Sequence, residues 1–571
     1  MRPAGRGELD SLYFDYPEYT FRAPAELDGA RTRHPVIIAG AGPVGLTAAL
    51  ALARLGVASV VIEKKNTVND GSRAICVSRY SFETLQQLGV VASFAAKGLG
   101  WTSGRCYFRD QLLHQFSMPH SEDERFLPMY NIQQQYIEQF LIDAAAEYPD
   151  LIDIRWLSEV AAVNQDEAGV ELEIVTPQGN YPLRGEYLLA ADGARSSVRN
   201  LLGLRLNGRN LPGNYVIADI RMDHDFPTER RSFFESSANP EATILIHRQP
   251  DNIWRVDWQV PAGADLEEAV TETTVRERVA AILAMIGHRG EWELEWWSIY
   301  TANTLCLDDY CHDRVLFVGD SAHIVPIFGV RGLNNGIADA VNAAWKLAYT
   351  LQRRAGSKLL GSYTPERRGA TLDVFRNAGK SSRFMTPPTR GYSLMRKAVL
   401  ELALTEDFAK PFVDPRQVQP WIYDQSPLTS PGVACEVFAD GPPPGAPLQN
   451  IRLGENDFLL DHIGPGFTVL YFAGVTAGDT FAATFLPILR EIDPLLRVLV
   501  VTKDKDGAVV VGDQCLHDPS HHLVERYGAG PGTLYLVRPD RHVVGRWRHP
   551  DESTVTAALH RALGEPHEAD A

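Results

Sequence analysis

The first regular pattern in the chain is a short apolar run, Val36–Ala39, that ends in a turn at Gly40. Apolar, partly β-branched runs of this length are typical of buried parallel strands. Apolar residues then recur at helical spacing and predict a helix over 43–55, and a second apolar run predicts a strand over 58–62. The order strand, turn, helix, strand predicts an α/β unit with a parallel sheet.

The glycines of this turn have the spacing of a dinucleotide-binding motif. Gly40 allows the tight turn, Gly42 lets the backbone approach a pyrophosphate, and Gly45 lets the helix pack close to the strand. Glu63 ends the second strand, roughly twenty residues beyond the glycines, where a carboxylate accepts hydrogen bonds from a ribose. A chance glycine-rich turn is the alternative, and the motif alone does not distinguish NAD from FAD.

A different pattern occupies the middle of the chain. Polar and apolar residues alternate over 215–221, 243–248, 253–260 and 294–300, and these runs are rich in aromatic and β-branched residues. The alternation predicts the strands of a half-covered sheet, and a helix is predicted over 271–286 on that sheet.

A proline-rich boundary precedes the last part of the chain. Residues 391–440 are helical and then proline-rich, and the run Gly441-Pro-Pro-Pro-Gly445 follows them. The elements expected beyond this boundary are strands over 467–472, 496–501, 533–537 and 542–547, and helices over 482–492 and 553–563.

Composition narrows the possible functions. The net charge of −17 argues against nucleic-acid binding, because a polyanion needs a basic face. No window approaches the ~18 consecutive apolar residues of a membrane span, and the first residues lack the apolar core of a signal peptide. We therefore expect a cytoplasmic protein with no membrane partner. The six cysteines form no CxxC and no zinc-type spacing, so no metal is expected. His517, His521 and His522 lie close together near Cys515, which a solvated loop explains as well as a metal site does.

A second glycine motif lies far downstream, where Val315–Val318 leads into Gly319-Asp320 and then, past Pro326, into a long helical run from Gly332. With the segment Asp192-Gly193-Ala194-Arg195, this motif resembles the single-component flavoprotein aromatic hydroxylases, the para-hydroxybenzoate hydroxylase and phenol hydroxylase group. The resemblance spans about Pro35 to Arg368 and favours FAD as the dinucleotide.

The resemblance implies which residues bind the cofactor. Asp320 would contact the ribityl chain of FAD, Asp192 and Gly193 would contact FAD and the nicotinamide cofactor, and Arg73 would touch the flavin. Gln134 would lie on the cofactor side of its helix. The expected cofactor-binding residues are Gly40, Gly42, Pro43, Val44, Gly45, Glu63, Lys64, Arg73, Gln134, Asp192, Gly193, Gly319, Asp320, Pro326, Gly332, Leu333 and Asn334.

The resemblance also implies a reaction. In that family NAD(P)H reduces FAD, O₂ adds to the flavin C4a atom, and the hydroperoxide transfers oxygen to an electron-rich ring. We expect a small phenolic or aromatic-acid substrate. Pro326 matches a proline whose carbonyl lies by substrate and flavin. The chain departs from many members at Ile327 and at Arg331, where they carry proline and glutamine. A cation at Arg331 would favour negative charge on the reduced flavin or on a phenolate, and pairing with a local carboxylate is the alternative.

The family's substrate domain corresponds to the alternating region. The residues expected at the catalytic site are Pro326, Arg331, Tyr215, His247 and Arg248, with Trp258 and Tyr300 as further candidates. If His247 or Arg248 points inward, it could hold a phenolate or a carboxylate. Packing or surface exposure is the alternative for each residue on this sheet.

The fold expected is α/β, with a Rossmann-like FAD domain of the glutathione-reductase type, an inserted, mostly antiparallel substrate sheet and a C-terminal thioredoxin-like domain. The expected segments are an N-terminal extension (1–34), the FAD domain (35–203 and 301–390), the substrate sheet (204–300), a connection (391–440) and the thioredoxin-like domain (441–571). Without CxxC that last domain has no redox chemistry, and packing or homodimer formation is its expected role. The aromatic N-terminal extension either packs on the body or another subunit, or is a partly disordered leader.

Three other functions stay open at this point. One is hydroxylation of a larger, polyketide-type phenol, which differs mainly in the volume of the pocket. Another is a flavin-dependent dehydrogenase or reductase that inserts no oxygen. The third is a non-catalytic binding protein on a flavoprotein fold, against which the intact Glu63, Arg73, Asp192 and Asp320 argue.

Overall fold

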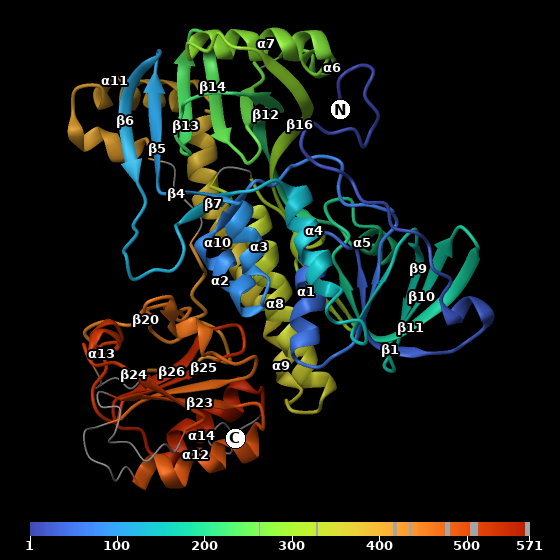
Figure 1. Cartoon of the computed structure of the whole chain (residues 1–571), viewed down its shortest axis with the longest axis vertical. Helices are drawn as coiled ribbons and strands as arrows, with labels where there is room; N and C mark the ends of the chain where they lie inside the picture. Colours follow the sequence, from blue (N-terminus) through green and yellow to red (C-terminus); the bar gives the residue numbers. More distant parts are fainter. Residues whose placement is uncertain are drawn as a thin grey trace.

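The structure is a computed structural model, and its description covers residues 1–261, 263–326, 329–414, 419–432, 437–473, 480–502 and 512–565. Three sheets follow one another along the long axis of the molecule (Figure 1). A large sheet lies at one end, a sheet associated with several helices lies in the middle, and a sheet from the C-terminal part lies at the other end.

The middle sheet carries the first glycine motif. Its strand order is β17-β18-β11-β1-β2-β8, and β10 and β9 extend from β11. The strands β18, β11, β1, β2 and β8 run parallel. Val36, Ile37 and Ile38 of β1 are fully buried because β1 is a central strand covered by helices. The bounds are β1 (Arg33–Ala39), β2 (Ser59–Ile62), β8 (Ile152–Arg155), β9 (Glu159–Gln165), β10 (Val170–Thr176), β11 (Gly179–Ala190), β17 (Cys311–His312) and β18 (Val315–Phe317).

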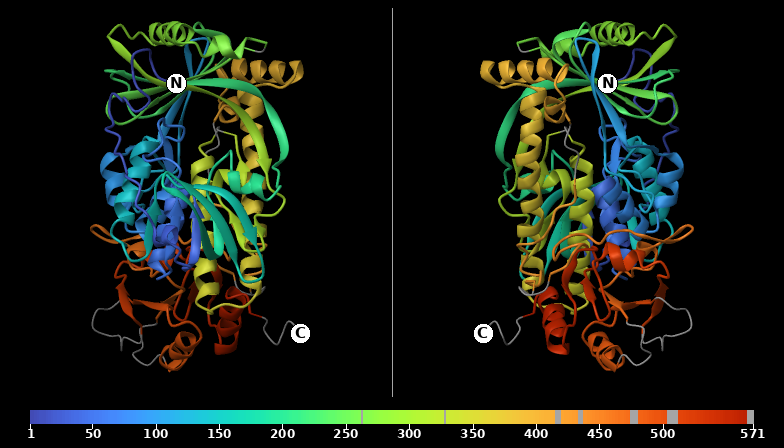
Figure 2. Two further views of the ribbon diagram at one scale, coloured as in Figure 1. Left: turned by 90° about the vertical axis from the view of Figure 1, so that its right-hand side faces the viewer. Right: turned by 90° about the vertical axis from the view of Figure 1, so that its left-hand side faces the viewer.

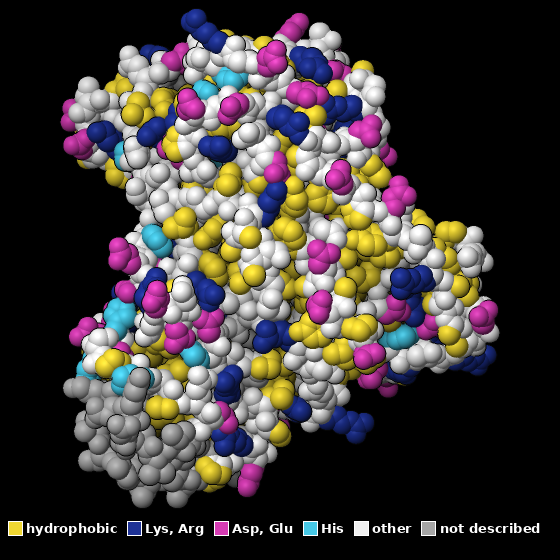
Figure 3. All heavy atoms as spheres, in the orientation of Figure 1, with side chains coloured by type: hydrophobic (Ala, Val, Ile, Leu, Met, Phe, Trp, Pro, Cys, Tyr) yellow, Lys and Arg dark blue, Asp and Glu magenta, His cyan; other side chains and the backbone are white. Residues whose placement is uncertain are grey.

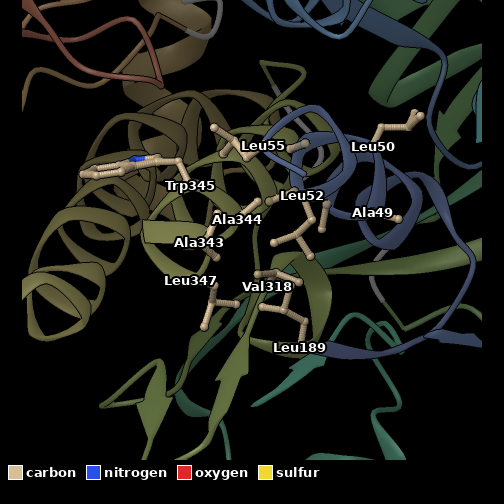
Figure 4. Packing of buried hydrophobic residues seen from close by; sticks show 14 of the residues in the cluster. Ala49, Leu50, Leu52, Leu55, Leu189, Val318, Ala343, Ala344, Trp345 and Leu347 are labelled. Carbon is tan, nitrogen blue, oxygen red and sulfur yellow. The ribbon is translucent and has the colours of Figure 1, made fainter. Parts of the chain in front are cut away.

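Helix α1 (Pro43–Arg54) follows β1 and packs against α8 (Gly332–Leu351) and α4 (Gln134–Ala145). Figure 4 shows Leu52 of α1 close to Ala344 of α8. Both belong to the apolar cluster that also contains Leu189 of β11 and Val318, which follows β18. The strand, helix and strand predicted over 36–62 are confirmed.

The large sheet has the order β19-β16-β12-β15-β14-β13-β5-β6. Neighbouring strands are antiparallel except β13 and β5, which run parallel. Helix α7 (Glu272–Met285) covers one face and buries Val275 and Val279 against the sheet. The sheet recruits residues 103–117 as β5 and β6, so it is wider than the alternating region alone predicts. The bounds are β5 (Ser103–Phe108), β6 (Gln111–Ser117), β12 (Asn207–Met222), β13 (Arg230–Ser236), β14 (Asn239–Arg248), β15 (Ile253–Gln259), β16 (Trp292–Cys306) and β19 (His323–Ile324).

The C-terminal sheet has the order β24-β23-β22-β25-β26. β22, β23 and β24 are parallel, and β25 and β26 are antiparallel to their neighbours. Its strands and two longer helices match the predicted ones to within about two residues, and β24 and α13 are additional. Residues 474–479, which precede α12 in the chain, lie outside the described residues. The bounds are β22 (Thr468–Phe472), α12 (Thr480–Ile492), β23 (Arg497–Thr502), β24 (Gln514–His517), α13 (His522–Arg526), β25 (Leu534–Val537), β26 (Val543–Trp547) and α14 (Glu552–Ala562).

Helix α10 (Tyr363–Met385) runs from the middle sheet to the large sheet, where α11 (Arg390–Ala403) follows it (Figure 2). A small sheet of three strands, in the order β3-β7-β4, contributes Cys76 and Trp101 to a buried cluster. The remaining elements are η1 (Ala25–Asp28), β3 (Cys76–Ser78), α2 (Arg79–Gln87), α3 (Val91–Lys97), β4 (Leu99–Trp101), β7 (Met129–Asn131), α5 (Ser197–Leu201), α6 (Leu266–Ala269), η2 (Gly319–Ser321), α9 (Lys358–Gly361), η3 (Asp407–Phe412), β20 (Arg452–Gly454), β21 (Asp457–Phe458) and η4 (Leu459–Asp461).

The N-terminal extension lies on the body of the protein. The amino group of Met1 donates to the carbonyl of Trp297 at 2.7 Å, and Arg2 Nη1 donates to Glu295 Oε1 at 2.7 Å. Tyr19 stacks on Trp156 with ring centroids 4.2 Å apart. Of the two alternatives, the structure therefore favours a packed arm.

The surface carries both signs of charge. On the face drawn in Figure 3, Lys and Arg side chains are interspersed with Asp and Glu. Within the described part of the chain, no helix combines the length and the apolar character that crossing a membrane requires.

Candidate active site

The first glycine turn is shaped by close backbone approaches. Gly40 has φ +105°, and a Cβ there would lie 2.6 Å from the Ala191 carbonyl oxygen. A Cβ on Gly45 would lie 2.0 Å from the Gly40 oxygen, whereas one on Gly42 would meet nothing within 4 Å. Gly42 therefore leaves an open side next to the start of α1, where a phosphate can approach uncapped N–H groups.

Glu63 lies beside this turn. Its Oε2 accepts a hydrogen bond from Ala41 N at 2.9 Å, and its Oε1 accepts one from Lys65 N at 3.0 Å. These bonds fix the carboxylate half-buried at the end of β2, where a ribose can reach it. Lys64 is exposed.

The loop that carries Arg73 is held by α4. Buried Glu138 accepts hydrogen bonds from Asn69 N at 2.7 Å and from Gln134 Nε2 at 2.8 Å. Gln134 Oε1 in turn accepts from the backbone N–H groups of Arg73 and Ala74, both at 3.3 Å. Burial raises the pKa of Glu138, although the hydrogen bonds from Asn69 and Gln134 oppose the rise. Gln134 therefore shapes the loop, and the exposed Arg73 side chain projects from it.

The Asp-Gly segment and the second glycine motif are joined directly. Arg199 donates to the Ser321 carbonyl at 2.9 Å and to the Ala194 carbonyl at 2.8 Å. Asp192 Oδ2 accepts from Val198 N at 3.0 Å, while its buried Oδ1 has no hydrogen-bond partner in the structure. An orphaned carboxylate oxygen at this place fits a ligand hydroxyl.

The second glycine turn meets the first at Val44. Gly319 has φ +61°, and a Cβ there would lie 3.1 Å from the Val44 side chain. Its N–H donates to Asp339 Oδ2 of α8 at 3.0 Å. Asp320 follows with an exposed side chain, and Gly193 turns the neighbouring segment with φ +78°. All three predicted cofactor segments thus converge, and their open glycine, orphaned oxygen and acidic side chains fit FAD.

The turn into α8 is strained. Val330 has φ +62°, which a β-branched residue rarely adopts. Asn334 fixes this turn, because its Nδ2 donates to the Val330 carbonyl at 2.7 Å and its Oδ1 accepts from Ser78 N at 2.8 Å. The Asn334 side chain is therefore occupied within the protein, and Gly332 and Leu333 form the first turn of α8.

Pro326 and Arg331 flank this turn and are both buried. Ile327 lies outside the described residues. Arg331 lines a cavity of about 890 Å³ between α2, α8, α10 and the C-terminal part.

The expected substrate residues divide between the two faces of the large sheet. Tyr215, His247 and Tyr300 lie on the face away from α7. Arg248 lies on the α7 face, where its guanidinium carbon is 5.6 Å from the centroid of the Trp254 ring. Trp258 belongs to the apolar cluster under α7. The structure therefore does not bring Arg248 and Trp258 together with His247, because neighbouring residues of a strand point to opposite faces.

The hydroxyl of Tyr215 contacts Thr386, the residue that follows α10. It lies 2.5 Å from Thr386 Oγ1 in a buried hydrogen bond, and the ring stacks on Tyr300 with centroids 5.6 Å apart. Tyr215 therefore joins the large sheet to the end of α10.

An ion pair that the sequence did not reveal links the large sheet to the Arg73 loop. Arg255 of β15 donates to Asp219 at 2.9 Å from Nε and at 2.8 Å from Nη2. The same guanidinium donates to the carbonyls of Ser72 and, at 3.1 Å, Arg73. In the sequence, charged Arg255 and Asp257 alternate with Trp254, Val256 and Trp258, which signals a strand with one polar face. We call this polar face of the large sheet, which lies away from α7, the inner face.

Burial controls the ionisation of this inner face. It raises the pKa of Asp257 to about 7 and that of the Cys76 thiol to about 12. Burial, with Arg230 and Arg255 nearby, lowers the pKa of His247 well below its usual range. His247 is therefore a neutral imidazole at pH 7, able to donate or accept one hydrogen bond at each ring nitrogen.

Among the described residues, no group of three His, Cys, Asp or Glu side chains could hold a metal ion. Of the histidines near Cys515, His522 has a contact with another part of the chain. His522 Nε2 lies 3.2 Å from Asp123 Oδ1, and the Cys515 thiol lies 3.2 Å from Thr502 Oγ1.

The fold and the converging turns define a class of dinucleotide-binding flavoproteins. Residues 33–378 match the family described as FAD binding domain, and the chain belongs to that family. FAD is its cofactor, as the resemblance implied.

Named relatives of the chain are hydroxylases. The chain is 27% identical over 542 residues to 3-(3-hydroxy-phenyl)propionate/3-hydroxycinnamic acid hydroxylase of Mycolicibacterium smegmatis, covering 91% of this chain and 92% of the relative. It is 28% identical over 536 residues to the protein of the same name from Escherichia coli, covering 89% and 91%.

Solved structures share the fold. The flavin-dependent monooxygenase PieE, in complex with FAD and substrate, is 22% identical with a TM-score of 0.75, covering 94% of this chain and 100% of that chain. Aklavinone-11 hydroxylase, in a ternary complex with FAD and aklavinone, is 23% identical with a TM-score of 0.75 and the same coverage. The resemblance to FAD-dependent aromatic hydroxylases and the predicted α/β fold class are confirmed.

Proposed function

We propose that the protein is an FAD-dependent monooxygenase that uses NAD(P)H and O₂ to hydroxylate a small phenolic or aromatic-acid substrate. The observation that carries this proposal is the convergence of the three cofactor segments beneath a buried, partly polar sheet face. The relatives named as 3-(3-hydroxy-phenyl)propionate hydroxylases align over about nine-tenths of the chain and support a small aromatic acid. The likeness to aklavinone-11 hydroxylase is one of fold and carries no argument for a larger substrate.

The turn at Gly42, with Glu63 and Asp192, would hold FAD, which would supply hydride acceptance from NAD(P)H and activation of O₂. The chain supplies the positions. Arg255 fixes the Arg73 loop to the large sheet through the Ser72 and Arg73 carbonyls, so the substrate face and the flavin loop keep one separation. Because that face is buried, it also excludes bulk water from the reacting atoms.

The C-terminal part has a structural role in this proposal. We infer that residues 441–571 form a thioredoxin-like domain that packs on the FAD domain, and that the protein is a homodimer. The mixed sheet with three parallel and two antiparallel strands supports the first inference. The absence of CxxC from the sequence supports a role without redox chemistry.

The test is coupled turnover. The FAD-loaded protein is incubated with NADH or NADPH and 3-(3-hydroxyphenyl)propionate, while nicotinamide oxidation, O₂ uptake and product mass are followed. We expect the phenol to stimulate oxidation and to gain one oxygen atom per nicotinamide consumed. 3-Phenylpropionate, which lacks the phenolic hydroxyl, is the matched control and should not be hydroxylated. If a panel of phenols and phenolic acids yields only hydrogen peroxide, the protein is an oxidase or reductase and the proposal is wrong.

A further inference from the structure

A row of side chains crosses the inner face of the large sheet. The strand registers place Asp219 opposite Arg255, Arg255 opposite His247, and His247 opposite Arg230. Directly opposed residues of neighbouring strands project from the same face. The row therefore leads from the ion pair that holds the Arg73 loop to Arg230.

The two arginines of this row differ in their partners. Arg255 is neutralised by Asp219, with hydrogen bonds of 2.9 and 2.8 Å. Arg230 is 3% exposed, its Nε has no hydrogen-bond partner, and across the described residues no carboxylate lies within ion-pair distance of it. The neighbouring Glu229 is engaged elsewhere, with Arg231 at 2.6 Å and Arg105 at 3.2 Å.

Other polar atoms on this face of the large sheet are also without partners. They are His247 Nδ1, the Tyr300 hydroxyl and Asp257 Oδ1, all buried. Burial lowers the pKa of Arg230, and the Cys76 and Cys106 thiols, Asp257 and Tyr300 oppose the fall. Buried polar atoms are nearly always paired, so an unpaired guanidinium opposite an unpaired imidazole nitrogen indicates a ligand.

We propose that Arg230, with His247, forms an anion-binding pocket that holds the carboxylate of the aromatic substrate. This assignment rests on the proposed function and specifies its substrate as an aromatic acid. Arg230 is the residue that would form the ion pair, and the imidazole of His247 would complete the carboxylate's hydrogen bonds.

The ligand is a carboxylate because of the charge and shape of the pocket. A permanently charged guanidinium that is buried without a counterion favours a permanent anion over a neutral phenol. Its planar fork matches the two oxygens of a carboxylate. Asp257 does not serve as a full counterion, since burial raises its pKa to about 7.

The surroundings also suit an aromatic ring. The buried cluster of Ile75, Cys76, Trp101 and Met129 lies on the side of the small sheet, and the centroids of the Trp101 and His247 rings are 6.5 Å apart. Cys76 lies three residues after Arg73 in the chain. A substrate whose carboxylate binds Arg230 would therefore have its ring near the loop expected to touch the flavin.

The test compares an acid with its neutral analogue. The probes are 3-(3-hydroxyphenyl)propionate and 3-(3-hydroxyphenyl)propan-1-ol, and binding to the FAD-loaded protein is measured by the change in flavin absorbance. Wild type should bind the acid more tightly than the alcohol. Arg230→Met should weaken binding of the acid by roughly 30-fold or more, because it removes a buried charge partner. Binding of the alcohol should change by less than about threefold.

Two further variants complete the experiment. Arg248→Met is the matched control, since Arg248 lies on the opposite face, and it should bind both probes as wild type does. Arg230→Lys keeps the charge but loses the planar fork, so it should weaken binding of the acid less than Arg230→Met does. It also provides the test if the Arg230→Met protein fails to retain FAD. The proposed pocket would be wrong if wild type bound the acid and the alcohol equally well. It would also be wrong if both Arg230 variants kept the wild-type preference for the acid over the alcohol. Hydroxylation of neutral phenols in that case would leave the proposed function standing.

Discussion

The C-terminal part of the chain is joined to the FAD-binding part by buried charges. Glu366 of α10 accepts hydrogen bonds from Arg538 at 2.6 and 2.9 Å, and from Lys346 of α8 at 2.7 Å. Arg538 also donates to Asp540 at 2.6 Å. These four side chains are at most 3% exposed. The charges of two carboxylates and two cations therefore balance one another in a space that excludes water.

We expect Arg538→Met to lower the free energy of unfolding by about 3–5 kcal/mol, the usual cost of removing one partner from a buried ion pair. Burial alone would raise the pKa of Glu366, but Arg538 and Lys346 together lower it. Without Arg538 the group keeps one cation for two carboxylates. Methionine retains most of the apolar volume, so the loss reports the uncompensated charge rather than a cavity.

Urea unfolding followed by tryptophan fluorescence measures this loss, because the Trp345 ring centroid lies 5.1 Å from the Arg538 guanidinium carbon. Arg184→Met is the matched control. Its pair with Glu171 is 45% and 46% exposed, and such pairs contribute about 0–1 kcal/mol. Adding Glu366→Gln to Arg538→Met removes the surplus charge, so the double variant should lose less stability than the two single losses added together. Equal unfolding midpoints for Arg538→Met and Arg184→Met would refute the reasoning.

The glycine turn and the inner sheet face each give a further test. Gly45→Ala should prevent folding, because its Cβ would lie 2.0 Å from the Gly40 oxygen, whereas Gly42→Ala should fold and lose FAD, since its Cβ points into open space. Far-UV circular dichroism and flavin absorbance separate the two results, and a Gly42→Ala protein that keeps FAD would contradict the assignment. Burial raises the pKa of Asp257 to about 7, against ~3.9 for an unfolded carboxyl. The native state then holds the extra proton, so stability should fall as pH rises from about 4 through about 7. The melting temperature of Asp257→Asn should vary less over this range, and pH slopes identical to those of wild type would be evidence against the shift.

Features encoded by neighbouring residues could be predicted from the sequence. The predicted helix over 43–55 is α1 (Pro43–Arg54), and the strand over 58–62 is β2 (Ser59–Ile62). Their signals are local, because one turn with glycines at fixed spacing determines where the strand ends and the helix begins. The recruitment of residues 103–117 into the large sheet could not be predicted in this way, since β5 pairs with β13, more than a hundred residues away in the chain.

The faces of the large sheet show where the prediction was incomplete. Alternation in a strand separates two sets of residues but does not say which set faces the flavin. Ile244 and Ile246 pack under α7, so Arg248, two residues further, lies on that face and His247 on the other. His247 and Arg248 are equivalent candidates in the sequence, although a strand cannot direct two consecutive side chains to one site.

Arg230 was missed for a related reason. Glu229-Arg230-Arg231 reads as a charge run, and such runs are usually solvated. In the fold all three are at most 5% exposed, because β13 lies between β14 and β5 inside the sheet. Alternation then sends Arg231 to the face where it pairs with Glu229, and Arg230 to the opposite face without a carboxylate. A charge that is costly to bury thus remains uncompensated beside the residues that hold the flavin loop, and a substrate anion would remove that cost only while it is bound.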